Sequence, residues 1–497
     1  MTDKEFAIVS ENLQSLPGID TTTDWERSYN FHNTLRSVLG KVTTSDEGIP
    51  ADQLYYFLSR GYNRNDRVGK SYLEYQYEDI LHGYKSKIKN VTDSTGSVVN
   101  TEVLSDGKRG KDLVLSIDMD LQMKVEKIIE QELWSLKRLP GTHFLDRAYV
   151  VLMDPKTGEV LTMAGKRIVK NEKTGRAEMM DDALGTFTST YNVGSAVKGA
   201  TVLTGYKTGA ITPNTYLNDE GIKIKSTPLK KSWMYLGTLN EIDALKKSSN
   251  VYMFRTAIRI GGGEYVYDHP LNLKSKSFDI IRNSFAGFGL GTRTGIDLPN
   301  EQVGLKGTSK LPGFLLDLVI GQYDTYSPMQ MAQYVSTIAN DGFRMQPHLV
   351  KEIREPVEGI KGIGSVYQEI HPKVLNTIDV KPDWLRRVKI GFKKVFQEPG
   401  GTANKYFNDV PYSPAGKTGT AEAFYDGPKR YLYGKEPPPV INLSLVSYAP
   451  SSNPKIAMAV LVPWAYQGKT ENKANLTIGR KVLDTYFHYE KKKEETK

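Results

Sequence analysis

The segment Lys417-Thr418-Gly419-Thr420-Ala421-Glu422-Ala423-Phe424 has the pattern of a β-strand, and two more strand-like runs follow it, at 441–448 and 456–463. Consecutive strands joined by short connections pair antiparallel. Earlier in the chain, two strands are expected at 149–153 and 159–164, followed by a largely helical middle. After the Lys417 sheet, a closing helix is expected at 476–489. This order predicts an α+β domain in which helices flank an antiparallel sheet.

The first strand of this sheet also carries a candidate binding site. An exposed strand edge can hydrogen-bond an extended peptide, and Gly419 lets a ligand approach the backbone closely. The triplet Lys-Thr-Gly recurs in a hairpin turn, a charged loop and a helix end, beginning at Lys156, Lys173 and Lys207. Only the copy that begins at Lys417 lies on a predicted strand.

A candidate nucleophile lies in Ser195-Ala196-Val197-Lys198. A serine hydroxyl needs a base within hydrogen-bonding reach, and residues three apart on a helix share a face, so Lys198 is placed to be that base. Burial and the nearby cation of Lys417 would both favour its neutral amine. Other Ser-x-x-Lys copies occur in polar, turn-rich stretches, at Ser86, Ser105 and Ser452. Only Ser195 opens an apolar helical run.

A third motif, Ser248-Ser249-Asn250, follows a helical segment at 241–247 and precedes the apolar run 251–254. This placement predicts a loop between two buried helices, which is a common location for catalytic residues. The other Ser-x-Asn copies, at Ser10 and Ser451, have no such surroundings.

In this order and spacing the three motifs resemble those of a class B penicillin-binding protein. Further segments extend the resemblance: Phe288-Gly289-Leu290-Gly291, Thr294-Gly295-Ile296-Asp297, Gly321-Gln322, Ser327-Pro328-Met329-Gln330 and Gly401-Thr402-Ala403. Upstream, Gly69-Lys70-Ser71 and Leu115-Ser116-Ile117-Asp118 resemble the pedestal of the same family. The resemblance implies the penicillin-binding serine transpeptidase fold, preceded by an N-terminal mixed pedestal domain.

The resemblance implies a peptidoglycan D,D-transpeptidase that cross-links stem peptides through an acyl-serine intermediate and is a target of β-lactam antibiotics. Ser195 would attack the D-alanyl-D-alanine carbonyl, and Lys198 would take its proton. Ser248 would relay a proton to the leaving amine, and Asn250 would orient Lys198 and the substrate amide.

The strand motif has the substrate-binding role in this resemblance. Lys417 and the hydroxyls of Thr418 and Thr420 would hold the substrate carboxylate, and Gly419 would leave room for the peptide. The backbone N–H groups of Ser195 and Thr420 would form the oxyanion hole.

Three segments are expected along the chain: a truncated pedestal or dimerisation-like domain at 1–145, the transpeptidase domain at 146–489 and a charged, disordered tail at 490–497. An amphipathic helix at 119–137 is expected at the first boundary.

Composition agrees with a globular, extracytoplasmic enzyme without specifying one. The longest apolar run, 456–464, is far shorter than the ~20 residues that span a bilayer, and the chain has no cysteine. We expect a soluble piece that lacks an N-terminal single-pass membrane anchor, with the catalytic domain outside the membrane in the full protein. The resemblance also implies a membrane glycosyltransferase partner of the N-terminal domain.

Several classes of function are not expected. The net charge is +9, but the 66 Lys and Arg residues are scattered among 57 acidic ones. Contact with nucleic acid is therefore not expected, whereas contact with anionic wall polymer or lipid headgroups stays open. The seven histidines lack metal-binding spacing and a catalytic-triad context, so no metal or cofactor is expected. The loop 424–439 is either a gate for the acceptor amine or an ordinary hairpin excursion.

Two alternatives to a transpeptidase stay open. One is a β-lactamase or β-lactam sensor, although no glutamate-bearing segment for a deacylating water is evident. The other is a non-catalytic scaffold that docks other wall-synthesis proteins. Within the transpeptidases, the short tail after the catalytic domain favours an elongation-type enzyme of a Gram-positive rod over a division enzyme.

Overall fold

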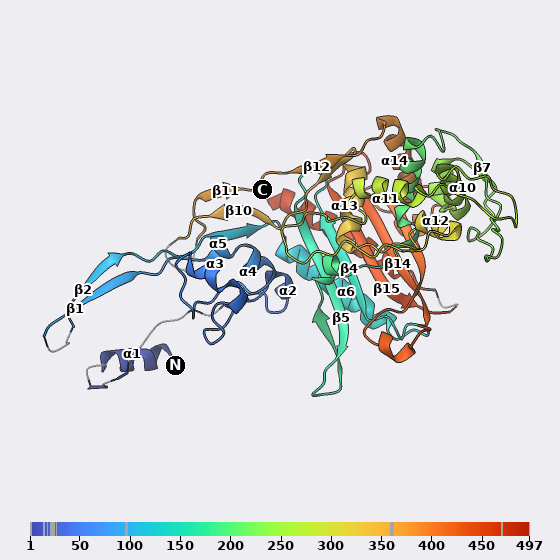
Figure 1. Cartoon of the computed structure of the whole chain (residues 1–497). Helices are drawn as coiled ribbons and strands as arrows, with labels where there is room; N and C mark the ends of the chain where they lie inside the picture. The colour runs from blue at the N-terminus through green and yellow to red at the C-terminus, as the bar shows by residue number, and fades with distance from the viewer. Residues whose placement is uncertain are drawn as a thin grey trace. The chain divides into compact units, whose positions relative to one another are not determined.

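The computed structural model describes residues 2–12, 15–16, 18–19, 25, 27–94, 98–357, 362–468 and 471–496. The chain divides into two compact units, 1–33 and 34–497. The first unit contains helix α1 (Asp3–Glu11), which begins with a capping box formed by Thr2 and Glu5. The second unit holds every predicted site residue (Figure 1).

A six-stranded sheet forms the centre of the second unit, and its strand order is β13-β14-β15-β4-β5-β6. Every neighbouring pair in it is antiparallel, as the sequence predicted. The strands are β4 (Arg147–Met153), β5 (Val160–Lys170), β6 (Ala177–Asp181), β13 (Ala415–Phe424), β14 (Pro439–Ala449) and β15 (Ile456–Tyr466). Strand β13, which carries the Lys417 motif, lies at one edge and pairs only with β14 within this sheet.

Both faces of this sheet are covered, which explains why its central strands are almost continuously apolar. Along β4, Val150 and Leu152 belong to one core cluster, whereas Tyr149 and Val151 belong to another. Side chains alternate between the two faces of a strand, so two separate clusters along one strand mean two buried faces.

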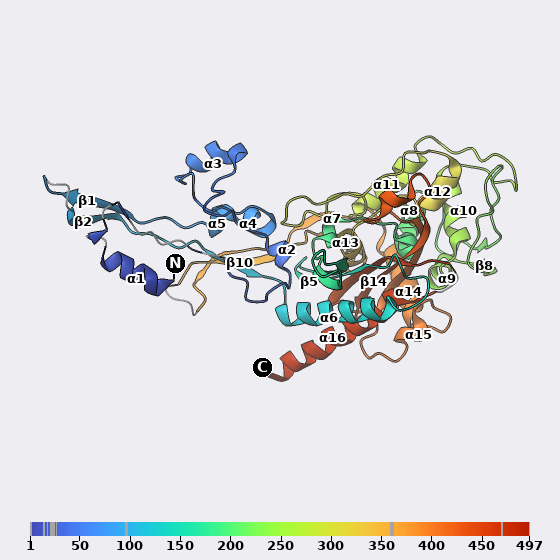
Figure 2. The same ribbon diagram turned by 90° about the horizontal axis from the view of Figure 1, so that it is seen from below.

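Helices α6 (Met119–Leu136) and α16 (Ala474–Thr496) pack against each other and cover one face (Figure 2). Helix α6 confirms the predicted amphipathic helix, and Asp118 caps it by accepting a hydrogen bond from the backbone N–H of Leu121 at 3.0 Å. Helix α16 continues through Thr496, so the expected disordered tail is wrong. Lys493 in this last part pairs with Asp118 at 2.6 Å, which ties the tail to the start of α6.

Helix α13 (Pro328–Ala339) covers the opposite face, against β4, β14 and β15. The other helices of this part of the chain are α7 (Gly185–Thr188), α8 (Lys198–Lys207), α9 (Glu241–Lys247), α10 (Asn250–Ile260), α11 (Ser277–Gly287), α12 (Pro312–Leu318), α14 (Pro382–Gln397) and α15 (Asn404–Phe407). Two short ladders complete the region, β7 (Leu217–Asn218) with β8 (Thr238–Leu239) and β9 (Phe343–Met345) with β12 (Val374–Thr377).

The part of the second unit that precedes α6 is joined by backbone pairing to the part that follows α6. Its strand β3 (Asp112–Leu115) pairs with β10 (Val350–Arg354), which in turn pairs with β11 (Val366–Glu369). Tyr77 also donates a hydrogen bond to Asp297 at 2.8 Å. The remaining elements are α2 (Arg36–Leu39), α3 (Leu54–Leu58), α4 (Tyr72–Gln76), α5 (Glu78–Leu81), β1 (Lys87–Thr92) and β2 (Val98–Ser105).

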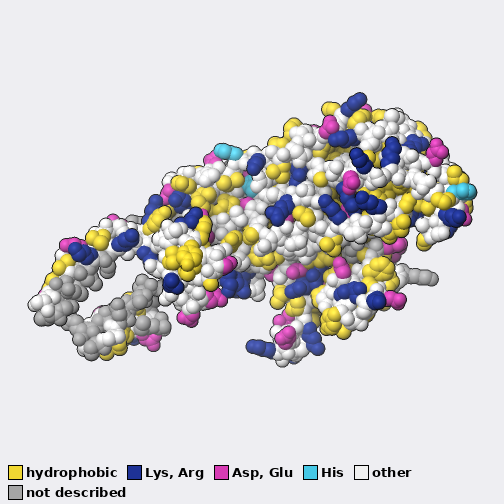
Figure 3. All heavy atoms as spheres, in the orientation of Figure 1, with side chains coloured by type: hydrophobic (Ala, Val, Ile, Leu, Met, Phe, Trp, Pro, Cys, Tyr) yellow, Lys and Arg dark blue, Asp and Glu magenta, His cyan; other side chains and the backbone are white. Residues whose placement is uncertain are grey.

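On the face in Figure 3, Lys and Arg side chains are interspersed with acidic and apolar ones. No helix among the described residues is long and apolar enough to cross a membrane.

Candidate active site

The predicted nucleophile lies on a tight turn just ahead of a helix. Residues Gly194–Val197 form a 3₁₀ turn, and helix α8 begins only at Lys198. The expectation that Ser195 occupies the first turn of the helix is therefore wrong by one turn. Ser195 is half-buried, whereas Lys198 is completely buried. The turn thus leaves the hydroxyl-bearing residue partly accessible, whereas the lysine three residues later is enclosed.

Two glycines allow this turn to lie directly against the edge strand β13. A Cβ atom on Gly194 would lie 2.3 Å from the carbonyl oxygen of Thr420, and one on Gly419 would lie 2.2 Å from that of Val193. Gly194 also has a φ of 60°, a conformation that other residues rarely adopt. Any side chain at these positions would separate the nucleophile from the strand.

The amine nitrogen of Lys198 contacts the second motif. Its Nζ atom donates to the backbone oxygen of Ser248 at 2.8 Å, to Ser248 Oγ at 3.2 Å and to Asn250 Oδ1 at 2.7 Å. These contacts join residues 50 and 52 positions apart in the sequence. No hydrogen bond from Lys198 to Ser195 Oγ is present among the described residues.

Ser248 lies at the junction of two helices, as predicted. It ends α9 in a left-handed conformation, with φ 58° and ψ 44°. Asn250 begins α10, whose N-cap is Ser249. A left-handed non-glycine residue is strained and persists only when its surroundings hold it, which is common at functional sites.

The third motif meets the other two at one hydroxyl. Lys417 Nζ donates to Ser248 Oγ at 2.9 Å and to the backbone oxygen of Thr418 at 3.0 Å. Ser248 Oγ therefore lies between two buried lysines. The structure thus brings together Lys198, Ser248, Asn250 and Lys417, and the close approach of β13 places the turn of Ser195 beside them.

Both lysines lie in surroundings that disfavour a positive charge. Burial lowers the pKa of Lys198 well below its ordinary value, and the charge of Lys417 lowers it further, while the carboxylate of Asp219 acts in the opposite direction. Burial lowers the pKa of Lys417 to about 7. Both shifts favour the neutral amine form, which can accept a proton.

The edge strand presents its polar groups on one face. Thr418 is half-buried and Thr420 is exposed, whereas Lys417 and Gly419, which alternate with them along the strand, are buried. Thr418 Oγ1 forms a 2.7 Å hydrogen bond with Thr402 Oγ1. This face can receive an extended peptide that ends in a carboxylate.

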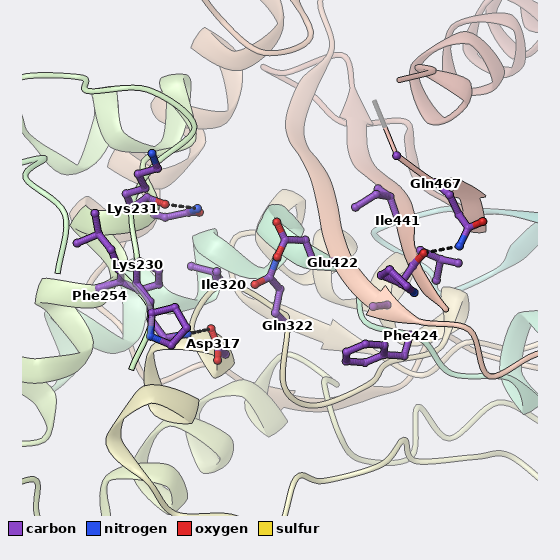
Figure 4. A pocket seen from close by; sticks show the side chains of 17 residues that line it. Lys230, Lys231, Phe254, Asp317, Ile320, Gln322, Glu422, Phe424, Ile441 and Gln467 are labelled. Atoms are coloured by element: carbon purple, nitrogen blue, oxygen red, sulfur yellow. Dashed lines mark hydrogen bonds and ion pairs between the residues drawn. The ribbon is translucent and has the colours of Figure 1, made fainter. Parts of the chain in front are cut away.

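A pocket of about 730 Å³ adjoins the site, and Asn250 and Glu422 both line it (Figure 4). Glu422 lies two residues beyond Thr420 on β13, so its side chain shares the open face of that strand. Phe254, Gln322 and Phe424 are also among the lining residues. Both ends of the predicted loop 424–439 reach this pocket, since Phe424 and Pro439 line it.

The sequence motifs did not identify the polar residues that lie behind the second motif. Asp219 hydrogen-bonds to Ser249 and to Ser232, the latter at 2.8 Å. Neither Asp219 nor Ser232 lies in a recognisable motif, and only a contact made by folding relates them to Asn250. No signal in the single sequence would have found them.

The alternative motif copies lie in structural positions. Lys156, in the turn between β4 and β5, bonds to Asn453, and Lys207 at the end of α8 pairs with Asp379. Ser86 Oγ donates to the backbone oxygen of Ser105. Within the described ranges, no cluster of three His, Cys, Asp or Glu residues is suited to hold a metal ion.

Comparisons with known proteins cover nearly the whole chain. Residues 148–484 match the family described as penicillin binding protein transpeptidase domain, and residues 1–115 match the penicillin-binding protein dimerisation domain. The chain is 54% identical to penicillin-binding protein 2A of Bacillus subtilis over 99% of its length and 68% of that protein. It is 25% identical to peptidoglycan D,D-transpeptidase MrdA of Escherichia coli, over 97% of this chain and 75% of that one.

Solved structures agree with these matches. Penicillin-binding protein 2B of Streptococcus pneumoniae superposes with a TM-score of 0.85 at 32% identity, covering 98% of this chain and 77% of that one. A chain from a structure described as "structural coordination of polymerization and crosslinking by a peptidoglycan synthase complex" has a TM-score of 0.67 at 23% identity. It covers 90% of this chain and 74% of the other.

Proposed function

The chain belongs to the class B penicillin-binding proteins, the peptidoglycan D,D-transpeptidases, and from this basis we propose how its residues share the acyl transfer. The family resemblance and the α+β transpeptidase fold expected from the motifs are confirmed. The residue roles rest chiefly on one observation, the shared contact of Lys198 and Lys417 with Ser248 Oγ beside the Ser195 turn.

Acylation begins at Ser195 in this proposal. Its oxygen attacks the carbonyl of the penultimate D-alanine of a stem peptide, and Lys198, as the neutral amine, takes the hydroxyl proton. The lowered pKa of Lys198 supports this role, because a protonated amine cannot accept a proton. The serine O–C bond forms as the carbonyl becomes a tetrahedral oxyanion.

Collapse of the tetrahedral intermediate needs a proton at the leaving nitrogen. Ser248 Oγ contacts Lys198 Nζ, so it can pass a proton outward to this nitrogen and regain one from Lys198. The C–N bond breaks, the terminal D-alanine leaves with its amine neutralised, and the acyl-enzyme remains. Asn250 Oδ1 keeps the Lys198 amine in place, 2.7 Å away.

The edge strand binds the donor peptide and stabilises the developing charge. Lys417 and the hydroxyls of Thr418 and Thr420 hold the terminal carboxylate, and the N–H groups of Ser195 and Thr420 receive the oxyanion. The close approach at Gly194 and Gly419 supports this assignment, since it brings the backbone next to Ser195 against the backbone next to Thr420. The stem peptide then extends along β13 toward the pocket lined by Glu422.

The second half of the reaction transfers the acyl group to an amine of a neighbouring stem. The amine nitrogen attacks the Ser195 ester and gives up a proton to Lys198. The C–O bond to Ser195 then breaks as Lys198 returns that proton to the serine oxygen, which completes the cross-link. A β-lactam has no separate leaving group, because its amide nitrogen stays tethered to the acyl group after ring opening. It therefore acylates Ser195 and remains there.

We assign the catalytic domain to residues 146–489 and the pedestal role to residues 1–145. The match of residues 1–115 to a dimerisation domain supports a binding role for the N-terminal part. A membrane glycosyltransferase is the proposed partner, supported by the likeness to a chain from a peptidoglycan synthase complex. In the full protein we place the catalytic domain outside the cell membrane, held by a single-pass anchor, and assign it to wall elongation.

The decisive experiment is intact-mass spectrometry of the chain with benzylpenicillin over several hours. We expect one stable adduct on the wild-type chain and none on Ser195→Ala. The matched control is Ser452→Ala, which removes the serine of another Ser-x-x-Lys copy and should retain the adduct. An adduct that disappears as drug is consumed would instead indicate a β-lactamase, and its complete absence at high drug would support the scaffold alternative.

A further inference from the structure

We propose that Asp219 is a positioning residue of the acyl transfer: its buried carboxylate holds the Ser248–Asn250 loop in place, and through Asn250 the Lys198 amine. The inference rests on the proposed function, in which Lys198 is the base. Asp219 belongs to none of the three motifs, and it follows the short strand β7, about 30 residues ahead of the loop that it contacts.

The Asp219 carboxylate is a buried hub with neutral donors only. Asp219 as a whole is only 4% exposed. It accepts hydrogen bonds from Ser232 Oγ at 2.8 Å, from the backbone N–H of Leu236 at 3.2 Å and from Ser249 Oγ. No ion pair to Asp219 occurs in the described part of the chain. A buried carboxylate without a cation partner is costly, so its retention calls for an explanation.

The two serines connect this carboxylate to the catalytic loop. Ser232 Oγ accepts from the backbone N–H of Asn250 at 2.9 Å, and Ser249 Oγ accepts from that of Tyr252 at 2.9 Å. Each hydroxyl thus donates to Asp219 and accepts from the start of helix α10. The carboxylate fixes the direction of both hydroxyl protons, and with it the position of the first turn of α10.

The consequence reaches Lys198 through Asn250. The Asn250 side chain donates from Nδ2 to the backbone oxygen of Lys231 at 3.2 Å and accepts at Oδ1 from Lys198 Nζ. Lys231 immediately precedes Ser232, so the same short segment holds the Asn250 backbone and orients its amide. Loosening Asp219 would therefore release the contact that keeps the base in place.

The second consequence is electrostatic. The charged groups that act on Lys198 are Lys417, whose charge lowers the Lys198 pKa, and Asp219, whose charge raises it. Burial lowers that pKa most of all. Asp219 is thus the one opposing influence among them, and it keeps Lys198 able to carry a proton between the two halves of the reaction. A neutral residue in its place would lower the pKa of Lys198 further.

The test compares Asp219→Asn with the wild type by the second-order rate constant of acylation with a chromogenic cephalosporin between pH 4.5 and 9. We expect a loss of roughly 10- to 100-fold, the fold-change associated with one charge-assisted hydrogen bond. We also expect the acidic limb of the profile to move to lower pH, because the pKa of the base falls. A purely structural role would slow acylation without moving the limb, and that result would overturn the proposal.

A second variant separates positioning from charge. Ser232→Ala keeps the carboxylate but removes one of its links to Asn250, so acylation should slow while the acidic limb stays where it is. If Asp219→Asn does not fold, this variant decides the matter, since an unchanged rate in a folded Ser232→Ala chain would overturn the proposal.

The matched control is Glu126→Gln, which neutralises another buried carboxylate, one that pairs with Lys166 under helix α6. It should change neither the rate nor the limb. Failure of the underlying function looks different: the wild-type chain itself would not be acylated at Ser195. A wild-type chain that is acylated, together with Asp219→Asn at an unchanged rate and limb, overturns the positioning role alone.

Discussion

Buried lysines lie on both sides of the central sheet, and the two regions use them in opposite ways. Under helix α6, Lys166 pairs with Glu126 at 2.6 Å and with Glu130 at 3.1 Å. On the other side, Lys198 and Lys417 contact only neutral oxygen atoms among the described residues. Burial by itself lowers the pKa of all three, yet that of Lys166 is raised because its two carboxylates outweigh burial.

The comparison shows that burial does not make a lysine reactive. A buried lysine with carboxylate partners keeps its charge and contributes to the structure, whereas burial among hydroxyl, amide and carbonyl oxygens lowers the lysine pKa and favours the neutral amine. The two lysines of the second kind also repel each other, which lowers the pKa of Lys198 further. The active-site region therefore keeps its chemistry at some cost in stability, as functional sites often do.

The largest expected effect comes from removing the base. Lys198→Met should slow acylation by benzylpenicillin by roughly 10²- to 10⁴-fold, the usual contribution of a general base. The unfolding temperature should change little, because the substitution removes the cost of burying a polar amine together with the hydrogen bonds that this amine makes. Stopped-flow acylation and calorimetry measure the two quantities. Lys207→Met, at the exposed end of the same helix, is the control, and an equal loss in that variant would contradict the assignment of the base.

A smaller effect, confined to stability, is expected on the opposite side of the sheet. Glu126→Gln leaves Lys166 with only its more exposed partner Glu130, and should lower the free energy of unfolding by about 3 kcal/mol. Denaturant unfolding measures this loss, while the acylation rate at 25 °C should stay unchanged. Glu130→Gln is the control and should cost less than about 1 kcal/mol. Slower acylation in Glu126→Gln would mean that the two sides are coupled.

The smallest expected effect is a pH dependence of substrate binding. Because the pKa of Lys417 is lowered to about 7, this residue is a cation below that pH and becomes neutral above it. The second-order acylation rate for a carboxylate-bearing β-lactam should therefore fall about tenfold for each pH unit above the midpoint. The methyl ester of the same β-lactam has no carboxylate to hold, so its profile should lack this alkaline limb. A limb of equal size with the ester would assign the titration to another group.

Part of the fold and of the site could be predicted from the sequence because its signals are local. The strand motif at Lys417, the amphipathic helix α6 and the loop at Ser248 were all correctly placed. Two expectations failed for non-local reasons. The tail is helical instead of disordered, and its Lys493 pairs with Asp118, far away in the sequence. Ser195 lies in a 3₁₀ turn instead of an α-helix, and this turn packs against β13 at Gly194.

The sequence by itself determined which residues we propose for the active site, because the proposed nucleophile, base and carboxylate-binding strand each carry a short motif in a fixed order. Only the tertiary structure decided how these residues behave. The pKa of Lys198 depends on burial and on Lys417, which lies more than 200 positions away in the chain, and on Asp219, which no motif includes. Burial and charge are properties of neighbours in space, and only the folded chain determines which neighbours a residue has.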